Sequence, residues 1–183
     1  MSWGNAARFA NWMHNGQPTG AQNASTTEDG SYYVNGKTSQ ADLFTVTRKA
    51  GATWVIPSVD EWYKAAYYKA STGYYYLYPT STDTMEWNFA NYQWGTETTV
   101  VGYYSAYPSP YGTYDQGGNA SEWTEATEGT SNGILRGGQY NFGEELLQST
   151  SSGLTAGRDA IYVPYGFRLV NLVTDPNRIN PND

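Results

Sequence analysis

The chain has 183 residues, with 10 lysines and arginines against 17 aspartates and glutamates, and a formal net charge of -7. This acidic balance argues against nucleic acid as a partner. The sequence contains no cysteine and one histidine, His14, which excludes disulfides, thiolate metal sites and centres that need two imidazoles. No apolar run is long enough to cross a bilayer, so one globular domain without a membrane span is expected.

The composition is also typical of a binding protein. Aromatic residues make up 16% of the chain, including 18 tyrosines and 7 tryptophans, whereas charged residues reach 15% against about 25% in typical domains. Aromatic rings give a protein surface a large contact area at a low cost in conformational entropy. We therefore expect an extracytoplasmic or cell-surface binding protein, although this chain carries no signal peptide.

The segment from Ser2 to Gly16 predicts the first helix. Apolar residues recur there with the spacing of one helix face: Trp3, Ala6, Ala7, Ala10 and Met13. Ser2 can cap the first turn, and Gly16 stands where a glycine commonly ends a helix. His14 falls in the last turn, where a histidine interacts favourably with the negative helix end, so a structural role is preferred over catalysis.

A second helix is predicted after a short buried strand. Residues 53–56 predict the strand, and a proline ends it. Ser58 and Glu61 have the spacing of a capping box, in which each side chain accepts a hydrogen bond from the other residue's amide. This helix is expected to end near Ala70. Earlier in the chain, Asn35 and Gly36 form the residue pair favoured in a tight hairpin turn.

Residues 71–183 are rich in Gly, Pro, Ser, Thr, Asn and Tyr, which predicts loops and brief strands. The best strand candidates are residues 99–104 and 165–170. The elements together predict an α+β fold with two helices, short strands and many ordered loops. We expect one domain over residues 1–172 and a flexible tail over 173–183. The tryptophans expected in the core are Trp3, Trp12, Trp54, Trp62 and Trp123.

Six segments resemble one family in their order along the chain: SWGNAARFANW, WVIPSVDEWYKAAY, NFANY, SPYGTYDQGGNASEW, LRGGQY and YGFRLV. They are similar to the formylglycine-generating enzyme, or sulfatase-modifying factor, domain, which has a C-type-lectin-like fold. The resemblance covers nearly the whole chain. Family members usually carry a further strand and helix before the segment that begins here at Ser2, so this chain is expected to be shortened at its N-terminus.

The resemblance implies the fold of these enzymes without their chemistry. Family oxidases use two cysteines, shortly after an RGG or KGG segment, to bind copper and activate oxygen. The corresponding positions here lie near Phe142 and Leu147, which can neither bind copper nor form a disulfide. Iron-dependent relatives use histidines of a partner domain, and one histidine cannot replace them. No copper or iron is therefore expected.

The resemblance does imply a calcium site. In the family, carboxylate and main-chain oxygens around a GN-x-x-E-W motif hold Ca²⁺, which takes six to eight oxygen ligands. The matching positions here are Asp115, Gly118, Ala120 and Glu122. The alternative is that Asp115 opens a turn and Glu122 is a solvated strand residue. In the terminal GFR segment, Arg168 is expected to be a buried or half-buried partner for a carboxylate.

The C-terminal segment is expected to supply a binding face. In lectin-like folds it lies near the ligand-facing surface, and residues 139–165 contribute the candidates Tyr140, Phe142, Glu144, Tyr162 and Tyr165. The main hypothesis is a non-catalytic recognition module that binds a protein or a glycan. One form of it is the variable protein of a diversity-generating retroelement, whose mutagenised segment ends just before a GFR-like strand.

Two other functions stay open. A cysteine-independent, oxidoreductase-like enzyme of the same superfamily would use carboxylates such as Glu144, Glu145 and Asp159, although nothing in the sequence brings these residues together. A structural or assembly role would use the tyrosine-rich surface to form an oligomer.

Overall fold

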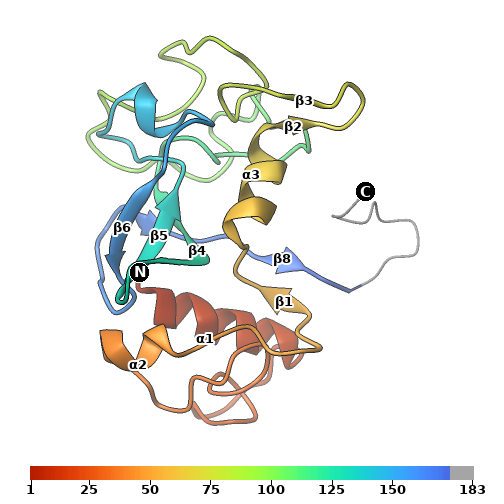
Figure 1. Cartoon of the computed structure of the whole chain (residues 1–183), viewed down its shortest axis with the longest axis vertical. Coiled ribbons are helices and arrows are strands. Elements are labelled where there is room, and N and C mark those ends of the chain that lie inside the picture. The colour runs from red at the N-terminus through yellow and green to blue at the C-terminus, as the bar shows by residue number, and fades with distance from the viewer. Residues whose placement is uncertain (174–183) are drawn as a thin grey trace.

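The computed structural model describes residues 1–173, which form an α+β fold of helices, short strands and long loops (Figure 1). All of the predicted tail except Val173 lies outside the described residues. Helix α1 (Trp3–His14) begins and ends as predicted, because the Ser2 side chain accepts a hydrogen bond from the Asn5 amide and Gly16 has a positive φ. None of the described helices has the length and apolar content that a membrane span needs.

Helix α3 (Val59–Tyr67) confirms the predicted capping box. The Ser58 hydroxyl accepts from the Glu61 amide at 3.1 Å, and the Glu61 carboxylate accepts from the Ser58 amide at 2.7 Å. The helix ends at Tyr67, three residues before the predicted end. The chain then enters β2 (Tyr68–Lys69), which pairs with β3 (Tyr74–Tyr75) and so ends the helix.

A third helix, α2 (Gln40–Phe44), was not predicted. It has one and a half turns, too short for an apolar period to show in the sequence. Its cap is nonetheless local, because the Ser39 side chain accepts a hydrogen bond from the Asp42 amide. Leu43 is its one buried residue, and it packs beneath α1 against the position of Gly4.

The main sheet has four strands in the order β6 (Leu154–Gly157), β5 (Asn132–Arg136), β4 (Ser121–Glu128) and β7 (Tyr165–Gly166). The first three strands are antiparallel, whereas β7 runs parallel to β4 and pairs with its first residues. A separate ladder joins β1 (Trp54–Val55) to β8 (Val170–Asn171) beside α1. The predicted strand over residues 165–170 is therefore two short strands in different sheets.

The predicted strand over residues 99–104 was wrong. This segment forms turns, in which the Tyr103 amide donates to the Val100 carbonyl. Val101 has 87% of its surface exposed, so the two valines do not mark a buried strand. The Asn35–Gly36 turn is present, with a positive φ at both residues, but it is not flanked by paired strands.

The core lies between α1, β1 and the first half of β4. Trp3, Trp62 and Trp123 are fully buried, as predicted, while Trp12 and Trp54 are half-buried. The indole nitrogen of Trp3 donates to the Thr124 carbonyl, and that of Trp123 donates to the Met1 carbonyl. These bonds satisfy the polar edge of two large buried rings and fix the N-terminus on the sheet.

Candidate binding surface

The connection from β3 to β4, residues 76–120, contains no helix or strand and lies at the end of the molecule opposite α1 (Figure 1). Its order comes from two asparagines. Asn91 donates through its side chain to the Glu97 carbonyl and to the Asn119 side chain, and the Asn119 amide donates to the Asn91 carbonyl. The Asn119 side chain also accepts from the Thr99 amide. Buried amide groups therefore hold this connection in place of a strand ladder.

Residues 139–147, which follow β5, join this connection. The Gly95 amide donates to the Tyr140 carbonyl at 3.1 Å, the Gln93 amide donates to the Phe142 carbonyl at 2.7 Å, and the Tyr140 amide donates to the Asn119 carbonyl. The two segments form one continuous surface, which we call the loop face: residues 76–120 and 139–147.

The five predicted ligand residues do not lie together. They fall into two groups, on opposite sides of the first residues of β4. Tyr140, Phe142 and Glu144 lie half-buried in the loop face. Tyr162 and Tyr165 lie on the other flank, where Tyr165 pairs with Ser121 and packs edge-on against Trp123. Of these five residues, Tyr162 is the exposed one, at 51%. Of the two residues near the family's cysteine positions, Phe142 is half-buried and Leu147 is buried.

The most exposed aromatic residues are ones that the sequence analysis did not select. Trp94 and Trp87 have 81% and 78% of their surfaces exposed, and Tyr103 has 67%. The remaining exposed large residues of the loop face are Val100, Val101, Tyr111 and Tyr114. Residue spacing does not identify these rings as exposed, because Met85, Trp87 and Phe89 alternate as they would in a half-buried strand, and Tyr92 stands two residues before Trp94.

Glutamates lie against tyrosines on this surface. Burial and the charge of Glu144 raise the pKa of Tyr92 and of Tyr78 above their ordinary values. Burial and Asp115 act in the same direction on the pKa of Tyr104. These hydroxyls stay protonated at neutral pH and remain hydrogen-bond donors.

The predicted calcium ligand Glu122 has other partners. Arg168 donates to both carboxylate oxygens, at 2.5 and 2.7 Å, and the buried indole nitrogen of Trp62 donates to one of them at 2.7 Å. This arrangement confirms that Arg168 pairs with a carboxylate. It also means that the residues present do not fit a calcium shell containing Glu122, because a cation there would have to displace a guanidinium.

The other predicted calcium ligands belong to the turn that leads into β4. The Asp115 carboxylate accepts from the Gly102 amide at 2.6 Å, and Asp115 itself has a positive φ. Gly118 also has a positive φ, and a Cβ there would collide with the Asn91 carbonyl. Ala120 directly precedes the strand. Calcium at these oxygens stays a prediction, and no group of three acidic or histidine side chains within residues 1–173 is arranged for a metal.

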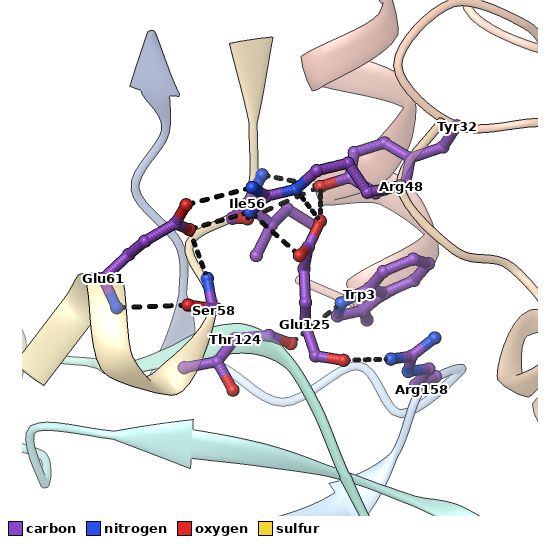
Figure 2. Close-up of polar contacts among 9 residues, drawn as sticks. All are labelled: Trp3, Tyr32, Arg48, Ile56, Ser58, Glu61, Thr124, Glu125 and Arg158. Atoms are coloured by element: carbon purple, nitrogen blue, oxygen red, sulfur yellow. Dashed lines mark hydrogen bonds and ion pairs between the residues drawn. The ribbon is translucent and has the colours of Figure 1, made fainter. Parts of the chain in front are cut away.

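A second polar cluster joins α3, β4 and the segment before β1 (Figure 2). The Arg48 guanidinium pairs with Glu61 at 2.8 Å and with Glu125 at 2.9 Å. Burial alone would raise the pKa of Glu61, but hydrogen bonds from Arg48 and Ser58 hold it below its ordinary value. Burial and Glu125 raise the pKa of Tyr32, whose hydroxyl donates to Glu125. Because each carboxylate already has a guanidinium partner, this cluster is structural.

A cavity of about 370 Å³ adjoins this cluster and is lined in part by Arg48, Glu125 and Arg158. Arg158 is buried with its guanidinium 4.0 Å from the centre of the Trp3 ring. It donates to the carbonyls of Leu43, Val46 and Glu125. Burial lowers the pKa of Arg158 to about 10, so it remains charged at neutral pH. Its hydrogen bonds join three separate segments, which is a structural role.

The carboxylates proposed for an enzyme do not gather at one site. Glu144 and Glu145 lie on the 3-10 turn η1 (Glu144–Leu146) in the loop face. Asp159 lies after β6, beside Gly157 and the side chain of Gln40. His14 accepts a hydrogen bond from the Thr53 amide and contacts the Thr53 hydroxyl at 2.8 Å, which agrees with a structural role.

Sequence comparison identifies the family. The family model of the sulfatase-modifying factor enzyme 1-like domain matches residues 1–173, the whole of the described structure. The chain belongs to this family. A comparison with curated proteins gave no match.

Solved structures agree on the fold. The structure resembles variable protein 1 of Treponema denticola with a TM-score of 0.70 and 19% identity, covering 92% of this chain and 68% of that one. It also resembles a crystal structure of CarF with a TM-score of 0.71 and 20% identity, covering 95% of this chain and 67% of that one. The predicted C-type-lectin-like fold of the formylglycine-generating enzyme family is confirmed.

Proposed function

We propose that this protein is a non-catalytic recognition module that binds a protein or a glycan through its loop face. The observation that carries the proposal is the exposure of Trp87, Trp94 and Tyr103 on an ordered surface. Apolar surface left exposed on one part of a protein commonly marks a binding site, and tryptophan and tyrosine are enriched among the residues that contribute most to binding.

The way the loop face is held supports the same role. Asn91, Asn119 and the backbone of residues 139–142 fix the connection from beneath, while the exposed rings extend from it. A surface held in this way loses little conformational entropy on binding. Tyr140 and Phe142 contribute their backbone to this support and their half-buried rings to the base of the surface.

The likeness to a protein titled variable protein 1 supports one special form of this proposal. In that form, the protein would be the variable protein of a diversity-generating retroelement, with variation before the terminal GFR segment. A reverse-transcriptase gene and a near-identical template repeat beside this gene would support that form. Their absence would leave the general recognition role intact.

The binding role is tested by screening the purified protein on protein and glycan arrays, with Tyr33→Ala as a matched control. Tyr33 is 52% exposed but belongs to the N-terminal part of the chain, far in sequence from the loop face. We expect saturable binding to a defined ligand that Tyr33→Ala retains. If neither array yields a ligand at micromolar protein concentration, or if Tyr33→Ala removes the signal, the proposal is wrong.

A further inference from the structure

The loop face carries negative charge and no positive charge. Residues 70–135 contain no lysine or arginine, and neither do residues 137–157. The charged residues of the loop face are all acidic: Asp83, Glu86, Glu97, Asp115, Glu144 and Glu145. The rest of the described chain carries both signs, so this surface is set apart by charge as well as by exposed rings.

Three of these acids are available to a partner. Glu86, Glu97 and Glu145 are exposed, and none of them takes part in the ion pairs found within residues 1–173. Glu86 directly precedes Trp87, and Glu97 follows Trp94 by three residues. The acids with internal roles are different ones, since Asp83 accepts from the Leu77 amide and Asp115 accepts from the Gly102 amide.

Two cations reach the edge of the loop face, Lys69 at Tyr76 and Arg168 at the Tyr114 carbonyl, and both already have internal partners. Arg136 is buried and donates to the Ser151 carbonyl, and Arg168 is bound to Glu122. Lys69 lies over the Tyr76 ring and donates to its hydroxyl at 3.4 Å. Burial is the main cause of the raised pKa values of Tyr92 and Tyr104, and the charges of Glu144 and Asp115 add to it.

We infer that the partner of the loop face is a basic protein surface, which presents arginine and lysine side chains to the exposed rings and carboxylates. A guanidinium can stack on Trp94 or Trp87 and pair with a neighbouring glutamate, so both features of the surface are used at once. An anionic glycan or a second copy of this face would meet like charge, and a neutral glycan would leave the carboxylates without a partner. This inference rests on the proposed function and specifies its ligand class.

The test follows tryptophan fluorescence of the full chain during titration with an acetylated hexa-arginine peptide. A hexa-citrulline peptide of the same length serves as the neutral probe. The test variant is Glu86→Gln with Glu97→Gln and Glu145→Gln. The matched control is Asp60→Asn with Glu128→Gln and Asp159→Asn, which removes three exposed acids outside the loop face. The control therefore has the same net charge as the test variant.

We expect the arginine peptide to bind and the citrulline peptide to bind about tenfold more weakly or worse. The loop-face variant should lose about tenfold in affinity, from three exposed charge pairs, and the control variant less than about twofold. Equal losses in the two variants, or no binding of the arginine peptide, would overturn the inference. A neutral or anionic array ligand bound through Trp87 and Trp94 would overturn it while leaving the proposed function intact.

Discussion

The guanidinium of Arg168, two residues after the end of β7, binds the carboxylate of Glu122 on β4 through two hydrogen bonds. Both side chains are largely buried, at 21% and 11% exposed. The pair therefore joins the C-terminal segment to the strand that begins at the loop face. The Trp62 indole, which donates to the same carboxylate, extends this connection to α3.

Arg168→Ala should lower the free energy of unfolding by about 3 kcal/mol, because it leaves a largely buried carboxylate with only an indole partner. Urea unfolding measures the change. The double variant Arg168→Leu with Glu122→Leu should recover part of the loss, since no unpaired charge remains. A single variant as stable as the parent would show that the pair does not stabilise the fold.

The Arg168–Glu122 ion pair also affects whether calcium can bind at the predicted site. Arg168 and Trp62 already use both oxygens of Glu122, which leaves Asp115 as the one carboxylate of the predicted site. Calcium takes six to eight oxygen ligands, so we expect the melting temperature of the parent protein to be the same in calcium as in chelator. A ligand at a hundredfold excess over its dissociation constant would stabilise the folded state by about 2.7 kcal/mol, a shift easily seen by thermal melting. A calcium-dependent rise that Asp115→Ala removes would refute this expectation and support the predicted site.

Stability should fall on acidification through the Arg48 cluster. Hydrogen bonds from Arg48 and Ser58 hold the pKa of Glu61 below its ordinary value of 4.5 despite burial. A carboxyl with a depressed folded pKa contributes stability above its unfolded pKa, and this contribution disappears as the pH falls through the folded pKa. Glu61→Gln should therefore flatten the dependence of unfolding free energy on pH below about 4.5. Asp60→Asn, at an exposed carboxyl on the same helix, is the control; an equal effect of both variants would contradict the assignment.

Gly118 is predicted to be intolerant of any side chain. Its positive φ disfavours a Cβ, and the Asn91 carbonyl oxygen, which would collide with that Cβ, excludes one. Gly118→Ala should destabilise the protein by about 2 kcal/mol or more, whereas Gly16→Ala, at a positive φ in open space, should cost about 1 kcal/mol. Thermal unfolding compares the two. Equal losses of stability in the two variants would mean that the close contact between Gly118 and the Asn91 carbonyl adds nothing to the cost of a side chain at Gly118.

Helices α1 and α3 could be predicted because their capping signals are local and each helix is long enough to show them together with an apolar face. Ser2, Ser58 and Glu61 cap helix ends through residues three positions away, so a short stretch of sequence contains both partners. The pairing of Arg168 with a carboxylate followed from the family resemblance, but the partner itself did not, since Glu122 lies 46 residues away.

The loop face could not be predicted in the same way. Its shape depends on contacts such as that between Asn91 and Asn119, which are 28 residues apart and have no periodic signal. Without that information, Val100 and Val101 looked like a buried strand, and although Trp87 and Trp94 were not among the expected core tryptophans, no pattern marked them as a binding surface. The predicted ligand residues Tyr140, Phe142 and Glu144 do lie in this surface, but its most exposed rings come from the preceding connection.

The most direct test of recognition through the loop face measures affinity for the ligand found by array screening. It compares the double variant Trp87→Ala/Trp94→Ala with the control variant Tyr33→Ala. Exposed rings contribute little to folding, so both proteins should melt as the parent does. The account predicts at least about a tenfold loss of affinity in the double variant and none in the control. Unchanged affinity in the double variant would contradict the account.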